Sequence, residues 1–120
     1  MSRIYHLAEP ADWAAAQRSG AYRISTRGRS LEDEGFIHAS DEHQWPVVRR
    51  SFYADVAGDL LLLEIDPDLL SHQVIREVGN PETGEEFPHI YGPITPGAVV
   101  AVRTIRAPHD GVGQPAAPVG

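Results

Sequence analysis

A short leucine-rich run constrains the possible folds of this chain more than any other feature. The run Leu60-Leu61-Leu62-Leu63-Glu64-Ile65-Asp66 has the length of a strand, follows Gly58-Asp59 and stops at Pro67. Because successive side chains of a strand point to opposite faces, an unbroken apolar run predicts a strand that is buried on both faces. We expect this strand to lie at the centre of the core.

The length of the chain indicates a single domain. A chain of 120 residues is well served by one core, and we expect the domain to cover residues 1–107. Residues 108–120 are rich in Gly, Pro and Ala and hold almost no apolar anchors, which predicts a flexible C-terminal tail.

Several other segments have strand patterns. Alternating or β-rich sequences predict strands over 3–7, 36–39, 74–78 and 98–105. An extended segment is expected over 87–94, where Pro88 and Pro93 suit the edge of a sheet or the end of a strand.

Helix signals are concentrated in the first half of the chain. Pro10 and Gly20 bound a predicted helix, and Ser30 with Asp33 forms a capping box that opens a short helical turn. A further helix is expected over 41–54; Pro46 must lie in its first turn, or the helix begins later. Residues 23–29 are polar and irregular. Six short strands interleaved unevenly with two helices near the N-terminus predict an α+β fold.

Composition excludes several classes of function. The chain has a net charge of −7 and no Lys, which argues against non-specific nucleic-acid binding but leaves room for one small anionic ligand held by Arg. The absence of Cys excludes disulfides, thiolate metal sites and a cysteine nucleophile, and it favours a reducing, cytoplasmic location. We expect no signal peptide and no membrane span.

Two histidine-containing segments hold the candidate chemistry. His38 lies in Gly35-Phe36-Ile37-His38-Ala39-Ser40, at the carboxyl end of a predicted strand, where ligands often collect. His89 and Tyr91 are two residues apart in Phe87-Pro88-His89-Ile90-Tyr91-Gly92-Pro93, so both project from one face of a strand. We predict His38, His89 and Tyr91 as catalytic residues; the alternative is that they satisfy buried backbone groups.

Other kinds of site find no support. No Ser lies in a Gly-x-Ser-x-Gly elbow, and phosphate-binding glycine loops are absent. A metal site made of His6, His38 and His89 would lack any characteristic ligand spacing, and we predict no metal. The acidic groups Glu32-Asp33-Glu34 and Glu85-Glu86 are expected to be solvated.

The order of these motifs resembles that of an uncharacterised bacterial family known as a domain of unknown function. The resemblance covers Arg3 to about Arg106 and rests on these segments: Ile4-Tyr5-His6, Ser30-Leu31, Glu34 to Ser40, Gln44, the leucine run and Phe87 to Pro93. That family is similar in fold to ADP-ribosyltransferases and RNA 2′-phosphotransferases. The resemblance implies a split, curved β-sheet around a cleft that holds an NAD or ADP-ribose type of ligand.

The resemblance also implies roles for individual residues. Tyr5-His6 and His38-Ala39-Ser40 match the motifs that end the first two strands of the phosphotransferases. By this likeness His6 and His38 would contact a ribose or phosphate, Ser40 would offer a hydroxyl or a helix N-terminus, and Arg29 would lie near the phosphate, with Gln44 also at the ligand. The catalytic Glu of the ADP-ribosyltransferases has no clear counterpart, since the late motif presents His89 and Tyr91 and only Glu86 is near.

Three hypotheses about function follow. The first is a non-catalytic module that binds a small anionic or nucleotide-like ligand, such as NAD or ADP-ribose. The second is a transferase of the ADP-ribosyl or 2′-phosphoryl type, in which a histidine acts as acid or base. The third is a structural or interaction protein without a ligand. The sequence does not predict the oligomeric state.

Overall fold

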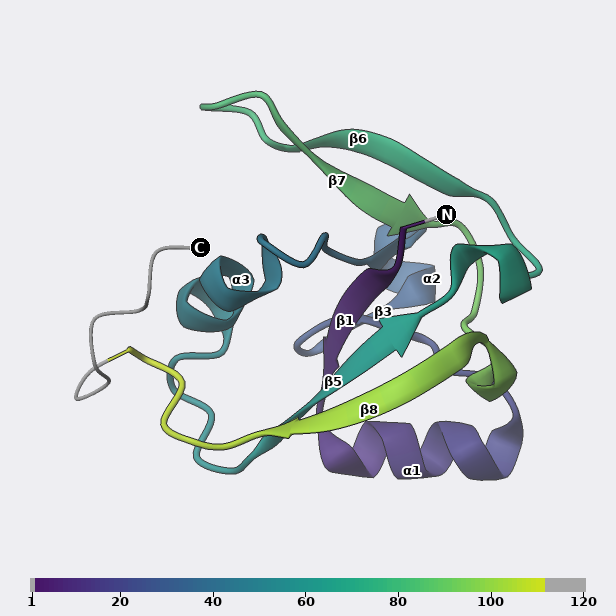
Figure 1. The fold of residues 1–120 in the computed structure, drawn as a ribbon, viewed down its shortest axis with the longest axis horizontal. Coiled ribbons are helices and arrows are strands. Elements are labelled where there is room, and N and C mark those ends of the chain that lie inside the picture. Colours follow the sequence, from purple (N-terminus) through teal and green to yellow (C-terminus); the bar gives the residue numbers. More distant parts are fainter. Residues whose placement is uncertain (1, 112–120) are drawn as a thin grey trace.

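The computed structural model describes residues 2–111 and shows an α+β fold, as the sequence predicted. Three antiparallel sheets and three α-helices make up this part of the chain (Figure 1). Their bounds are β1 Ile4–Ala8, α1 Pro10–Ser19, β2 Ile24–Thr26, β3 Arg29–Ser30, α2 Leu31–Glu34, β4 Ile37–His38, α3 Trp45–Phe52, β5 Leu60–Ile65, β6 Val74–Asn80, β7 Glu85–Ile90 and β8 Val99–Ile105. Single 3-10 turns lie at Pro67–Leu69 and Pro96–Ala98.

The leucine-rich run forms the central strand of the largest sheet, as predicted. β5 pairs antiparallel with β1 on one side and with β8 on the other. Its alternate side chains enter two hydrophobic cores: Leu63 and Ile65 pack into one, and Leu60 and Leu62 into the other. These four side chains are almost completely buried, so the strand is the element on which both cores depend.

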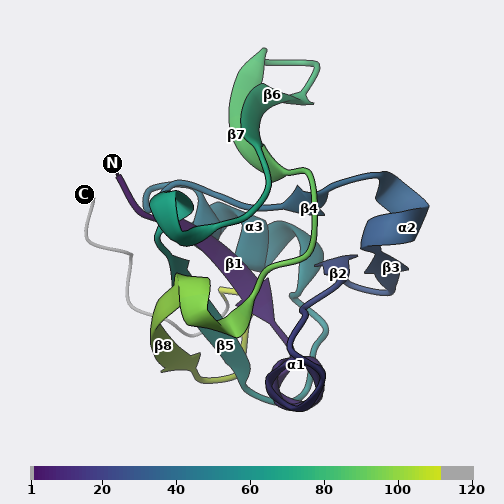
Figure 2. The same cartoon turned by 90° about the vertical axis from the view of Figure 1, so that its right-hand side faces the viewer.

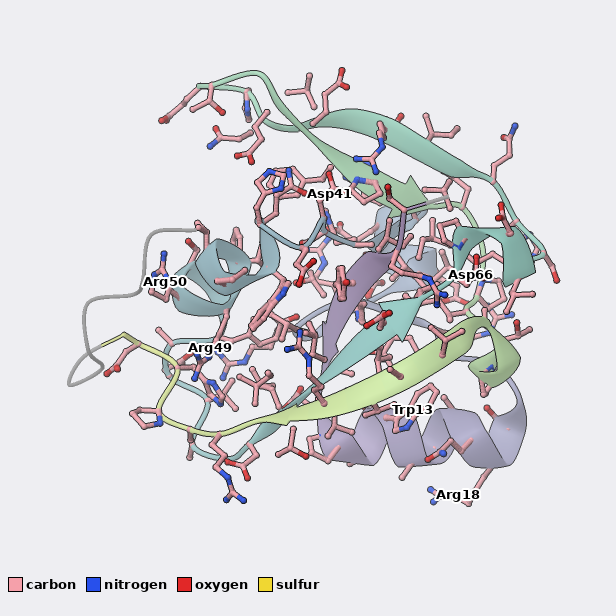
Figure 3. All side chains as sticks on the ribbon, viewed as in Figure 1. Trp13, Arg18, Asp41, Arg49, Arg50 and Asp66 are labelled. Atoms are coloured by element: carbon pink, nitrogen blue, oxygen red, sulfur yellow. The ribbon has the colours of Figure 1, made fainter. Side chains whose placement is uncertain are left out.

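Two helices cover the two faces of this sheet. α1 begins at Pro10, ends at Gly20 with φ +87°, and buries Trp13 and Ala16 in the first core (Figure 3). Glycine is required at such a C-cap because the left-handed conformation is costly for other residues. α3 packs against the second core through Val48 and Trp45.

The start of α3 is later than the sequence predicted. The helix begins at Trp45 because Pro46 must lie in its first turn. The four preceding residues form a turn in which the backbone N–H of Gln44 donates to the carbonyl of Asp41. This later start is the alternative that the sequence prediction allowed because of Pro46.

The second sheet has the order β4-β7-β6 and includes a long hairpin of β6 and β7 that projects from the body of the molecule (Figure 2). Of the two positions predicted for the Pro88 segment, a sheet edge or a strand end, the sheet edge is wrong, because β7 lies between two strands. Pro88 lies near the end of β7, two residues before Ile90. Proline is tolerated at position 88 because β4 pairs only with His89 and Ile90, so no N–H is needed from residue 88. The carbonyl of Pro88 accepts from the N–H of Ala39. Arg76 of β6 forms two hydrogen bonds with Asp41, which holds the hairpin against the loop before α3.

Two further segments differ from the sequence prediction. Residues 23–29, expected to be irregular, contribute the β2–β3 hairpin, which turns at Gly28 with φ +74°. The segment after β8 is packed as far as His109, which is fully buried and bonded to Arg49 of α3 and to the carbonyl of Gly58. The rest of the predicted tail, 112–120, lies outside the described residues.

In residues 2–111, no helix is both long enough and apolar enough to cross a membrane.

Candidate functional site

A cleft of about 620 Å³ lies between the main sheet, α3 and the β6–β7 hairpin. Its walls come from elements that are distant in sequence: β1, β2, the end of α2, β4, α3 and both strands of the hairpin. The predicted residues among its lining are His6, His38, Ser40 and His89. The cleft thus brings residues of the two histidine motifs together.

Local structure around α2 positions His38. The capping box of Ser30 and Asp33 opens this short helix, and Gly35 closes it with φ +85°. The chain then turns back so that Nε2 of His38 lies 3.3 Å from Oε1 of Glu34. Arg29 donates to the other oxygen of Glu34 at 3.0 Å. Burial lowers the pKa of His38, although hydrogen bonding to Glu34 opposes this, and 42% of the side chain is exposed.

His89 is held by a carboxylate from the neighbouring strand. Its Nδ1 lies 2.8 Å from Oε1 of Glu77, and the hydroxyl of Tyr91 donates to the same oxygen. The bond from Tyr91, followed by the one from His89, lowers the pKa of Glu77, and the pKa of Tyr91 is raised in turn. His89 is only 4% exposed. Its Nε2 is buried without a hydrogen-bond partner among the described residues.

The two histidine rings meet around Phe36. His38 and His89 are directly opposite in the β4–β7 register, and their ring centroids are 5.3 Å apart at 83°. Phe36 stacks on His89 at 4.0 Å and meets His38 edge-on at 4.8 Å. The result is a rigid unit in which each imidazole has one nitrogen held by a carboxylate.

His6 has a structural role in the arrangement. It is buried at the inner end of the cleft, and both of its nitrogens are bonded: Nδ1 donates to the carbonyl of His38 at 2.6 Å and Nε2 accepts from the hydroxyl of Tyr22 at 2.9 Å. Burial lowers its pKa to about 4, so the ring is neutral at pH 7. With neither nitrogen left for a ligand, His6 supports the backbone at His38.

Of the other predicted site residues, one lines the cleft and three lie outside its lining. Ser40 lines the cleft, and its backbone pairs with that of Tyr5. Gln44 is buried outside the lining; it accepts from the N–H of Asp41 and donates to Oε2 of Glu85 and the carbonyl of Glu86. Arg29 is exposed and reaches the site through Glu34. Tyr91 reaches the site through Glu77 and through its ring, whose centroid lies 5.5 Å from that of Phe36.

Three residues of the site were not predicted from the sequence. The sequence predicts Glu34 as part of a solvated acidic group, whereas the structure places it against His38; its position four residues before His38 is the signal that could have found it. Glu77 had no signal, because it meets His89 as a diagonal neighbour in a register that pairs Glu77 with Phe87 and Ile75 with His89. Phe36 was part of the His38 motif but had no assigned role.

The charged side chains that line the cleft are all acidic. They are Glu34, Glu82 and Glu85, and no Arg is among the described lining residues. Glu34 is paired with Arg29, whereas Glu82 and Glu85 have no ion pair within residues 2–111. Nowhere in that range do three His, Asp or Glu side chains form a group suited to a metal ion. The phosphate contact implied by the family resemblance therefore has no Arg among the described residues that line the cleft.

Comparison with known proteins gives a family and a set of related structures. Residues 7–102 match the family described as "Protein of unknown function (DUF952)". Two crystal structures of protein CC0527 from Caulobacter crescentus, one of a double mutant, are 26% identical, with 94% of each chain covered and TM-scores of 0.77. Its solution structure is also 26% identical, covers 95% of this chain and 93% of that one, and has a TM-score of 0.68. No curated protein matches this chain.

Proposed function

This chain belongs to the DUF952 family, and we propose that it binds a small organic ligand in its cleft. The description of the family assigns no activity, so the proposal rests on the cleft itself. His38 and His89 contact that ligand. The observation that carries the proposal is Nε2 of His89, a buried ring nitrogen without a partner in a side chain that lines the cleft. Leaving such a group unsatisfied costs on the order of 1–3 kcal/mol, and a ligand offers a reason for that cost.

The dimensions of the cleft support a ligand of about the size of a nucleoside. A volume of about 620 Å³ lies within the range of small-molecule pockets. The walls combine apolar side chains, among them Val48, Phe52 and Phe87, with a few polar groups. NAD, ADP-ribose and 2′-phosphorylated nucleotides remain candidate ligands on the family resemblance alone.

A transferase is the second candidate, and the geometry of His89 favours it. Glu77 accepts from Nδ1 of His89, which leaves Nε2 as the basic nitrogen. A carboxylate that orients an imidazole in this way is the usual arrangement of a general base. In such an enzyme His89 would take a proton from a ligand hydroxyl.

Titration of candidate ligands, followed by NMR of the histidine rings, tests the binding proposal. We expect at least one ligand in a panel of nucleosides, NAD, ADP-ribose and 2′-phosphorylated nucleotides to shift the ring signals of His38 and His89. His38→Gln and His89→Gln should each weaken binding about tenfold or more, the loss expected for one or two hydrogen bonds in a desolvated site. His43→Gln is the matched control, since His43 is exposed and outside the cleft.

Two outcomes decide between the candidates. Release of nicotinamide or inorganic phosphate from the panel, lost in His89→Gln, would establish the transferase. If no ligand shifts His38 or His89, and both variants lose only stability, the residues are structural and the binding proposal is wrong.

A further inference from the structure

We propose that the cleft selects a ligand with a positively charged nitrogen group, an amine or a guanidine, and disfavours phosphate and carboxylate. The inference rests on the proposed function and specifies its ligand. Two independent observations carry it: the cleft presents hydrogen-bond acceptors to a ligand, and its unpaired charges are negative.

The histidine nitrogens without a hydrogen-bond partner are acceptors. Glu77 accepts from Nδ1 of His89, and in the tautomer that makes this bond Nε2 holds the lone pair. His38 bonds Glu34 through Nε2 in the same manner, and its Nδ1 has no hydrogen bond within residues 2–111. A group that satisfies either nitrogen must donate an N–H or O–H. A carboxylate or a fully ionised phosphate is an acceptor only, and it would leave both nitrogens of the uncharged rings unsatisfied.

The charged side chains that line the cleft also favour a cationic ligand. Glu82 and Glu85 lie at the tip of the β6–β7 hairpin and line the cleft. Glu85 is fixed by the amide of Gln44, a neutral donor, so its charge is not cancelled. Both carboxylates are exposed, and water screens them, so their effect on binding is modest and falls with salt.

Aromatic walls complete a site suited to an organic cation. Phe52 of α3, Phe87 of β7 and Tyr5 of β1 line the same cleft. The face of an aromatic ring attracts an ammonium or guanidinium group, and its carbon surface accepts the apolar part of an amine. Phe52 is 62% exposed, a large apolar side chain left uncovered at the mouth of the cleft.

Three aromatic fragments that differ in a single group test this inference: tyramine, which carries an ammonium, tyrosol, which carries a hydroxyl, and 4-hydroxyphenylacetate, which carries a carboxylate. NMR titration of the full chain should give the order tyramine, tyrosol, 4-hydroxyphenylacetate, with about fivefold between the first two at low salt. Glu82→Gln/Glu85→Gln should remove most of this preference. Gln at position 85 keeps an oxygen for the amide of Gln44, so the hairpin should remain in place.

A matched control removes two charges elsewhere. Glu32→Gln/Asp68→Asn changes the net charge by the same amount at exposed positions outside the cleft, and it should leave the order of affinities unchanged. Equal or tighter binding of the carboxylate, or an unchanged preference in Glu82→Gln/Glu85→Gln, would overturn the inference. If the fragments fail to bind while a nucleotide of the earlier panel binds through His38 and His89, only this inference is wrong. If nothing binds at those histidines, the proposed function is wrong as well.

Discussion

The buried imidazole of His6 should make the stability of the protein depend on pH in a defined window. The ordinary pKa of 6.5 falls to about 4 in the folded protein, because burial disfavours the charged ring. The unfolded chain therefore binds more protons than the folded chain between these two values. The free energy of unfolding has its full contribution from His6 above pH 6.5 and loses it as the pH falls toward 4.

The size of the effect follows from the two pKa values. Their difference corresponds to roughly 3 kcal/mol when the loss is complete, and to about 2 kcal/mol between pH 8 and pH 5. His38 also has a lowered pKa and contributes with the same sign in this window. The lowered pKa values of four carboxyl groups act with the same sign at lower pH; these groups are Asp33, Asp41, Asp55 and Glu77. The contribution of His6 must therefore be isolated by comparison with a variant that does not titrate at this position.

Urea unfolding of wild type and His6→Gln over the same pH range provides that comparison. At pH 8 the variant should be less stable, because Gln replaces only part of the bonds to Tyr22 and to the carbonyl of His38. The difference in free energy of unfolding between the two proteins should decrease by about 2 kcal/mol from pH 8 to pH 5. The corresponding difference between wild type and His43→Gln should not decrease in this way.

If the difference in free energy of unfolding between wild type and His6→Gln stays constant from pH 8 to pH 5, the predicted contribution of His6 is wrong. Should His6→Gln fail to fold, NMR titration of the wild-type ring gives the same answer. The ring of His6 should stay neutral at pH 5, and protonation with a midpoint near 6.5 would contradict the structure.

Three further substitutions test the supports of the fold. Ser30→Ala removes the capping box of α2 and should lower the free energy of unfolding by about 1 kcal/mol, measured by urea unfolding. Arg49→Ala breaks bonds to His109 and to two carbonyls of the segment after β8 and should cost about 2–3 kcal/mol, while exposed Arg50→Ala should cost less than about 0.5. Leu63→Ala should cost about 2–5 kcal/mol by leaving a cavity, and a smaller loss would mean that the first core collapses around it.

Local signals in the sequence predicted most of the elements but not their pairing. The leucine run, the helix between Pro10 and Gly20 and the capping box at Ser30 depend on nearest neighbours, so their patterns were sufficient. The position of β7 between two strands was not predictable from Pro88. Whether a proline is tolerated depends on how far the partner strand extends, and β4 extends for two residues only.

The candidate site was predictable to the extent that it lies within single motifs. His38 and His89 were found because each lies in a distinctive short segment, and their approach to one another depends on the β4–β7 register. Glu77 could not be found, since its meeting with His89 requires the register of the β6–β7 hairpin. Gln44 matched the family motif, yet its role is to bond the hairpin to the loop before α3.

The number of hydrogen-bonded ring nitrogens distinguishes the structural histidines from those that can bind a ligand or take up a proton. His6 and His109 are fully or almost fully buried, and in each of them both nitrogens are bonded within the protein. His38 and His89 each have one nitrogen held by a carboxylate and one nitrogen without a bond within residues 2–111. A histidine whose two nitrogens are both committed can only support the fold, whereas one with a fixed tautomer and a remaining lone pair can recognise a donor or take up a proton. Both histidines of the second kind line one cleft and are paired in the β4–β7 register, which is why the proposed ligand site is placed at that pair.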